Sequence, residues 1–260
     1  MRPSWWCAVL GTAIGIGCFG ASTDRAASAE ALTVAGSTTF NAQVMVPYTA
    51  DIDAATGIKL NVIPNKSNEG LLALLAGQAD LAMISTGLEN EIELLRETKP
   101  ALPYHLLRSF LVSRVRVAFP IHPDNPVRSV SMAKLQQILS GDIGNWRDLG
   151  GPDLPIRVVA VKEGGGVKRT VESSLMKGQR ITPREPVVVE DAQQVVKAVA
   201  QDRGAMGLTQ FAVVRRHRVP ELRTNGLVEQ NLFLVSLNEP TDAMQAVIAA
   251  ARRAVFDEAP

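Results

Sequence analysis

The chain has 260 residues, of which 46% are hydrophobic and 20% are charged, a composition typical of a soluble globular protein. This length suffices for one large domain or for two lobes that each bury a core. The formal net charge is +1, and without its first 29 residues the chain carries 25 basic and 25 acidic side chains. This balance argues against nucleic acid or an anionic membrane as partner.

The N-terminus has the pattern of a secretory signal peptide over residues 1–29. Arg2 supplies a positive start, Trp5–Gly20 is apolar, and Ala27–Ala29 is a small-x-small cleavage site. The apolar run is shorter than the roughly 20 residues that a membrane span needs. Both cysteines, Cys7 and Cys18, lie in this segment, so the exported protein is predicted to contain no disulfide and no thiolate metal site. The residues before Cys18 do not match a lipoprotein site, and we expect no lipid anchor.

The first segment of the exported chain, Leu32–Phe40, reads as an apolar strand, a Gly-Ser-Thr-Thr turn and the start of a helix. Glycine permits a sharp turn after the strand. A Ser or Thr at a helix start caps free N–H groups, and the same groups can hold an anion. Two interpretations stay open for this turn: a simple helix cap, or part of an anion site.

The following segments alternate between strand and helix patterns. They read as helix 40–55 interrupted at Pro47, strand 59–63, loop 65–68, helix 69–76, strand 80–84 and loop 85–87. This alternation predicts parallel strands joined by crossover helices, with the polar loops gathered at one edge of the sheet. Ligands of open α/β sheets bind at that edge, so the three loops together favour a small polar ligand.

The second half of the chain continues with similar elements. Helix 89–98 is charged and is expected to be a solvated face. Later elements are strand 106–121, helix 131–139 capped by Ser131, strand 156–161, helix 169–176, strand 187–189, helix 191–200, and strands 204–208 and 231–237, with a final helix at 241–256. Between strand 156–161 and its helix lies KEGGGVK, whose glycines permit close approach of the backbone to a ligand. The alternative interpretation is a flexible turn.

Several blocks, in this order and spacing, resemble the periplasmic phosphate-binding proteins of ABC transporters. The most specific is residues 117–151, with NPV, QILSG and NW-x-DLGG; AGSTTF, SNEGL, ADLAMIS and GAMGL add support. The resemblance covers the chain from about residue 32 onward. It implies a periplasmic-binding-protein-like α/β fold with two lobes joined by a two-crossing hinge, lobe one being 30–117 plus 213–260 and lobe two 118–212. It also implies hinge closure over a ligand that is passed, unchanged, to a membrane permease.

The resemblance assigns ligand contacts residue by residue, with departures. Thr39 and Phe40 match the first turn, and Ser67 matches the second loop. In the third loop Thr86 stands where the family often has an acidic residue or arginine. In the fourth, Lys162 takes the place of an arginine and GVK the place of Ser-Gly-Thr. The predicted ligand-binding residues are Ser37, Thr38, Thr39, Phe40, Ser67, Ser85, Thr86, Lys162, Gly164, Gly165, Gly166 and Lys168.

The prediction is thus an exported, periplasmic, monomeric solute-binding protein that binds a small inorganic oxyanion, such as phosphate, and delivers it to an ABC permease. It needs no metal or other cofactor and does not bind nucleic acid. An alternative is a sensor or accessory protein with a degenerate anion site that acts through protein partners. A hydrolase is disfavoured because GxSxG and HExxH are absent and the three histidines are expected in loops or on the surface, away from the predicted site.

Overall fold

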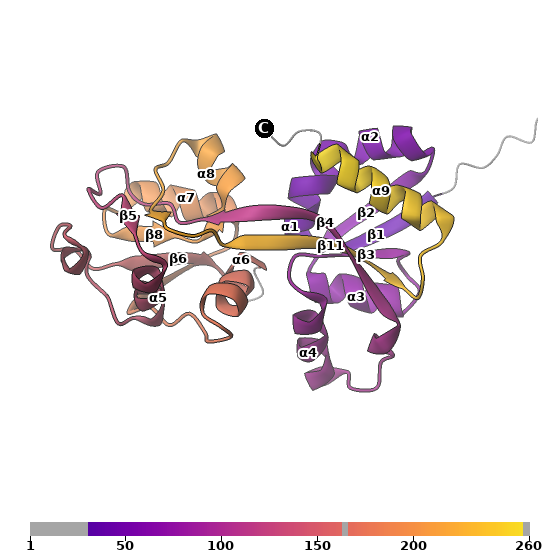
Figure 1. Cartoon of the computed structure of the whole chain (residues 1–260), viewed down its shortest axis with the longest axis horizontal. Coiled ribbons are helices and arrows are strands. Elements are labelled where there is room, and N and C mark those ends of the chain that lie inside the picture. Colours follow the sequence, from indigo (N-terminus) through magenta and orange to yellow (C-terminus); the bar gives the residue numbers. More distant parts are fainter. Residues whose placement is uncertain (1–30, 163–165, 257–260) are drawn as a thin grey trace, which may run out of the picture.

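The computed structural model describes residues 31–162 and 166–256, which form two α/β lobes. Strands β4 (Leu107–Ala118) and β11 (Glu229–Leu237) lie side by side and run between the lobes (Figure 1). The predicted fold class is therefore confirmed. Within the described residues, no helix has the length and the apolar character needed to cross a membrane. The predicted signal peptide and the glycines at 164 and 165 lie outside the described residues.

Lobe one is built on a six-stranded sheet in the order β2-β1-β3-β11-β4-β9. Strand β1 pairs in parallel with β2 and β3, whereas β11 is antiparallel to β3 and β4, and β4 is antiparallel to β9. The remaining strands of this sheet are β1 (Ala31–Ser37), β2 (Lys59–Asn65), β3 (Leu81–Ile84) and β9 (Thr209–Gln210). All four residues of β3 are buried, because helices cover both faces of the central strands.

One face of this sheet packs against α2 (Val46–Thr56) and α9 (Asp242–Phe256), and the other against α3 (Ser67–Leu75) and α4 (Leu88–Thr98). The first helix begins at α1 (Thr38–Phe40) and widens into a π-helical turn, Asn41–Met45, before α2. Pro47 lies in the first turn of α2 and has no N–H to donate to the preceding turn, which accounts for the interruption predicted there. A 3-10 turn, Tyr104–Leu106, precedes β4.

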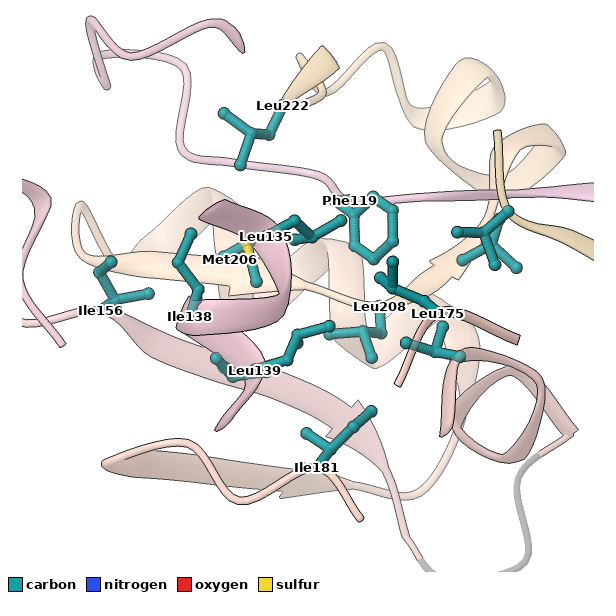
Figure 2. Close-up of a cluster of buried hydrophobic side chains, with 14 of the residues drawn as sticks. Phe119, Leu135, Ile138, Leu139, Ile156, Leu175, Ile181, Met206, Leu208 and Leu222 are labelled. Carbon is teal, nitrogen blue, oxygen red and sulfur yellow. The ribbon is translucent and has the colours of Figure 1, made fainter. Parts of the chain in front are cut away.

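Lobe two contains a parallel sheet in the order β7-β6-β8, formed by Arg157–Val161 (β6), Glu185–Val189 (β7) and Ala205–Gly207 (β8). Helix α7 (Ala192–Gln201) packs on one face. The other face is covered by α5 (Met132–Ser140), by α6 (Gly166–Thr170) and by the π-helical turn Val171–Leu175 that extends α6. Figure 2 shows this core, with Leu135, Ile138 and Leu139 of α5 directed at the sheet.

Trp146, at the start of the 3-10 turn Trp146–Leu149, anchors the Gly-rich segment of lobe two. Its side chain is fully buried, and its indole Nε1–H donates to the carbonyl of Gly204 at 2.9 Å. An indole buried in this way needs such a partner, because an unpaired N–H would lose its hydration without compensation. The conspicuous NW motif of the sequence is thus a core element of lobe two.

The crossing between lobes differs from the predicted boundary at residue 213. Helix α8 (Phe211–His217) lies beside α7, and β10 (Arg223–Thr224) pairs with β5 (Ser129–Val130), so this part of the chain belongs with lobe two (Figure 1). The chain pairs with the end of β4 through β9, and it returns to the centre of the lobe-one sheet along β11. The first crossing, along β4, ends at Ala118.

Two further predictions about single elements need correction. The polar loop 65–68 is almost absent, because β2 runs to Asn65 and α3 already begins at Ser67. Helix α4 was predicted to be a solvated face, but its Glu91 is completely buried, together with Ile92 and Leu95 of the same helix. The carboxylate can be buried because it forms an ion pair with Arg169.

Candidate ligand-binding cleft

A cavity of about 940 Å³ lies between the lobes. Lobe one contributes the start of α1 with the turns that follow it, the β2–α3 junction and Ser85 after β3. Lobe two contributes the ends of β6 and β7, the start of α6, and α8. Of the predicted site residues, Ser37, Thr38, Thr39, Ser67, Ser85, Lys162, Gly166 and Lys168 line this cavity. The structure therefore brings together residues that are up to about 130 positions apart in the chain.

The turn after β1 places two threonines at the cavity. Gly36 has φ of +132°, and a Cβ there would lie 2.2 Å from the carbonyl oxygen of Met83, so only glycine fits between β1 and β3. Ser37 is buried, and its Oγ accepts from the N–H of Phe40 at 3.2 Å, which caps α1. Thr38 is exposed and Thr39 is partly buried. The helix-cap interpretation is thus confirmed for Ser37, and the turn also lines the cavity. A role in an anion site stays a prediction.

Phe40 does not line the cavity, because its side chain is fully buried in the core of lobe one and its N–H is used by the cap. Thr39 instead contacts the segment that leads to lobe two: the amide Nε2 of Gln210 donates to its Oγ1 at 3.4 Å. The first turn is therefore tied to strand β9 at the crossing.

The second and third loops are joined by hydrogen bonds. The N–H of Ser85 donates to Oγ of Ser67 at 3.3 Å, and Nε2 of Gln230 donates to the carbonyl of Ser85 at 3.0 Å. Ser67, Ser85 and Gln230 are all buried. Ser67 accepts in its bond and keeps its hydroxyl proton, whereas the two bonds to Ser85 involve its backbone and leave its hydroxyl out. The bonds thereby fix where both residues lie at the cleft.

Thr86 points away from the cavity. Its hydroxyl donates to Oε1 of Glu91 in a short hydrogen bond, and Oε2 of Glu91 accepts from Nη1 of Arg169 at 3.0 Å. Glu91 belongs to lobe one and Arg169 to α6 of lobe two, so this ion pair joins the lobes. Sequence reasoning missed both residues. A signal existed, because Leu88, Glu91, Ile92 and Leu95 recur with the spacing of one helix face, which places the carboxylate among apolar positions.

The fourth loop approaches lobe one closely at Gly166, the first residue of α6. A Cβ there would lie 2.4 Å from Oγ of Ser85 and 2.5 Å from Nε2 of Gln230. Only a residue without a side chain permits this contact. The glycine that begins α6 thus permits a close contact with Ser85 and Gln230 of lobe one. The predicted approach of the triple-glycine turn to a ligand stays a prediction.

The charged residues around the cavity are only partly compensated. Lys162 is exposed and pairs with Glu190, and Lys66 pairs with Glu69 at 3.6 Å. The carboxylate of Asp191 accepts from two N–H groups at the start of α7. Two lining cations, Lys168 and Arg216, form no ion pair with any residue that the structure describes. An anion in the cleft would meet a net positive field.

His217 also lines the cavity, next to Arg216 on α8, which corrects the expectation that all three histidines lie away from the site. Its position could not be predicted, because no local pattern shows that α8 lines the cavity. His105 and His122 are not among the lining residues.

Comparison with known proteins places this chain among proteins of a known family. Residues 21–254 match the family model of the PBP superfamily domain. A phosphate-binding protein, PstS of Bacillus subtilis, is 24% identical over 196 residues, which are 75% of this chain and 62% of that protein's length.

Two solved structures share the fold. One, from Clostridium perfringens, is described as a phosphate ABC transporter substrate-binding protein with bound phosphate; it has a TM-score of 0.72 and 19% identity, covering 88% of this chain and 97% of that one. The other, an ABC-type phosphate transport receptor from Vibrio cholerae, has a TM-score of 0.68 and 20% identity, covering 88% and 98%. The resemblance that the motifs indicated is confirmed, and the chain belongs to the PBP superfamily.

Proposed function

We propose that this protein is exported to the periplasm, binds a small oxyanion of the phosphate class in the inter-lobe cleft without changing it, and delivers it to an ABC permease. The relatives named above are phosphate-binding or phosphate-transport proteins, which supports the ligand class. The observation that carries the proposal is the convergence of hydroxyls from separate loops of lobe one on a cavity that Lys168 of lobe two also lines, with no ion pair to any residue that the structure describes.

Hydroxyl and amide donors suit an oxyanion, because each of its oxygens accepts hydrogen bonds and carries part of the negative charge. Thr38 and Thr39 stand at a helix start, where the positive end of the helix dipole adds to the attraction. Lys168 supplies the charge that the hydroxyls lack. A lysine acts as a point charge and not as a bidentate fork, so we expect lower geometric selectivity than an arginine would give.

We expect little discrimination between phosphate and sulfate. Protonated phosphate is distinguished from sulfate by an acceptor for its proton, which a free carboxylate can provide. Glu91 already accepts from Thr86 and Arg169 with its two oxygens. The described carboxylates that line the cavity are also engaged: Glu69 and Glu190 pair with lysines, and Asp191 accepts from N–H groups of α7. Position 86 itself offers a hydroxyl that is engaged in this contact.

Isothermal titration calorimetry with inorganic phosphate and sulfate tests the proposal. The protein is expected to bind both, and Lys168→Gln should weaken binding about tenfold, the lower end of the range for a hydrogen bond to a charged group, because Lys168 is only half-buried. Lys134→Gln is the matched control, since Lys134 is exposed on α5 and does not line the cavity. Absence of binding for both anions, with the fold intact by circular dichroism, would refute the ligand assignment.

A second candidate is a sensor or accessory protein, and two contacts favour it. Thr86 and Lys162, both predicted ligand contacts, are bound to Glu91 and Glu190 instead. A site in which Thr86 does not line the cavity and Lys162 is paired with a lining carboxylate suits weak binding and action through protein partners. Uptake measured in cells with and without the gene separates the candidates: transport predicts a loss of oxyanion uptake, whereas the sensor predicts unchanged uptake and altered gene expression.

A further inference from the structure

We infer that the oxyanion bound in this cleft carries an organic substituent, as in a phosphate monoester or a phosphonate, and that the substituent lies between the first helix of lobe one and α8 of lobe two. The inference rests on the proposed function, because it places the anionic group on the hydroxyls described above. The inference adds that the anionic group is only the inner end of a larger ligand.

The first argument is size. Inorganic phosphate has five heavy atoms and occupies the space of two or three water molecules, which is less than about 100 Å³. The cavity measures about 940 Å³, a volume typical of sites for organic molecules.

The lobes already touch at one side of the cavity, so this volume belongs to a cleft whose lobes are in contact. Gly166 lies against Ser85, and Arg169 forms an ion pair with Glu91 at 3.0 Å. Phosphate on the hydroxyls at the base of the cleft would leave most of this space to water.

The second argument is the lining of lobe one beyond the hydroxyls. Thr38, Ala42 and Val46 follow one another along the first helix, and all three are exposed and line the cavity, as does Pro47. Along this row the lining side chains change from a hydroxyl at Thr38 to apolar groups at Ala42 and Val46. Gln43 and Tyr48 of the same helix also line the cavity. Val46 is 73% exposed, the largest value among the exposed large hydrophobic residues. Apolar side chains that line a cavity in this way mark contact with an apolar group.

The third argument is the facing wall on lobe two. Ala212 and Val213 line the cavity from the first turn of α8, and Arg216 and His217 follow one turn later. Along α8 the lining is therefore apolar in the first turn and basic in the second. An ester or phosphonate with an alkyl or aryl body fits between the two apolar walls, and the cations at the far end favour a ligand that carries no positive charge of its own.

Calorimetric titration of the full-length mature protein with phenylphosphonate and with inorganic phosphate tests the inference. Phenylphosphonate has no ester bond to hydrolyse and combines a tetrahedral anion with an aromatic ring. It is expected to bind at least about tenfold more tightly than phosphate, because the ring removes apolar surface of both walls from water.

Val46→Ser should weaken phenylphosphonate binding by about three- to tenfold and leave phosphate binding unchanged. The matched control is Val188→Ser, since Val188 is 68% exposed on β7 and does not line the cavity. This control should alter neither affinity.

The possible results separate the inference from the proposed function. Binding of neither compound overturns both. Binding of phosphate with equal or weaker binding of phenylphosphonate overturns the inference and leaves the proposed function standing. Tighter binding of phenylphosphonate that Val46→Ser does not weaken, or that Val188→Ser weakens as much, overturns the placement between the two walls. Tighter binding that only Val46→Ser weakens supports the inference.

Discussion

Replacing Arg169 with methionine tests the role of the ion pair that joins the lobes. Glu91 is completely buried, and Nη1 of Arg169 lies 3.0 Å from its Oε2. Removing one partner of a buried pair leaves an uncompensated charge and costs about 3–5 kcal/mol. The Arg169 side chain is 20% exposed, so water reaches the vacated space and the lower end, about 3 kcal/mol, applies. For a protein of this size, that corresponds to a decrease in Tm of about 6–12 °C.

Thermal unfolding followed by circular dichroism measures the change. The control is Arg147→Met, because Arg147 pairs with Asp153 at a similar 3.1 Å, but with side chains that are 61% and 68% exposed. Its loss should cost less than about 1 kcal/mol. The double variant Glu91→Gln with Arg169→Met removes both charges and should be more stable than Arg169→Met alone. Equal Tm changes for Arg169→Met and Arg147→Met would refute the reasoning.

Three further predictions concern the cleft and the core of lobe two. Gly166→Ala introduces a Cβ that would lie 2.4 Å from Oγ of Ser85, so it should weaken phosphate binding and enlarge the radius of gyration measured by small-angle X-ray scattering. Trp146→Phe removes the buried indole hydrogen bond and should lower the stability to urea unfolding by about 2 kcal/mol. Burial raises the pKa of Asp202, but hydrogen bonds from Arg157 and a backbone N–H outweigh it and lower the pKa below 3.8. The folded state therefore binds fewer protons at this carboxylate than the unfolded state. Asp202→Asn should accordingly lower the Tm above about pH 4, and this Tm difference should disappear as the pH falls further. Thermal unfolding measured across this pH range tests it.

Each of these predictions has a result that would contradict it. Gly87→Ala is the control for Gly166→Ala, because its new Cβ would meet nothing closer than 3.7 Å; equal effects of the two variants would exclude a steric cause at the lobe contact. A urea midpoint for Trp146→Phe equal to that of the unmodified protein would show that the hydrogen bond contributes nothing. A Tm difference for Asp202→Asn that persists unchanged at pH 2.5 would exclude titration of this carboxylate.

The strands and helices could be predicted from local patterns wherever those patterns are strong. Alternating or continuous apolar runs predicted β3 and β4, and Ser131 acts as the predicted helix cap, since its side chain accepts from an N–H group of α5. Asp191 caps α7 in the same way. The π-helical turn before Pro47 was foreseen only as an interruption. Its form depends on how the helix packs on the sheet, which no local pattern contains.

The candidate site could be predicted only in part, because its residues meet through long-range packing. Motifs located Thr39, Ser67 and Lys168, which line one cavity. The sequence did not reveal that Thr86 would turn toward Glu91, because the partner carboxylate lies on a helix whose charges appeared solvated. The role of α8 was also missed, since its place depends on the packing of Val214 against Val196 of α7 and Ala118 of β4, which are distant in sequence. Whether the predicted residues contact a ligand stays a prediction.

The paired strands β4 and β11 restrict the ways in which the lobes can move. Their antiparallel ladder extends from the pair Leu107–Leu237 to the pair Arg116–Glu229, and its register shifts once, between Leu232 and Phe233. Regular ladder hydrogen bonds resist stretching and sliding, whereas a β-bulge bends and twists more easily. Relative motion should therefore be a rotation about this irregularity, in which the separation of two probes across the cavity mouth changes while that of two probes along the ribbon stays constant.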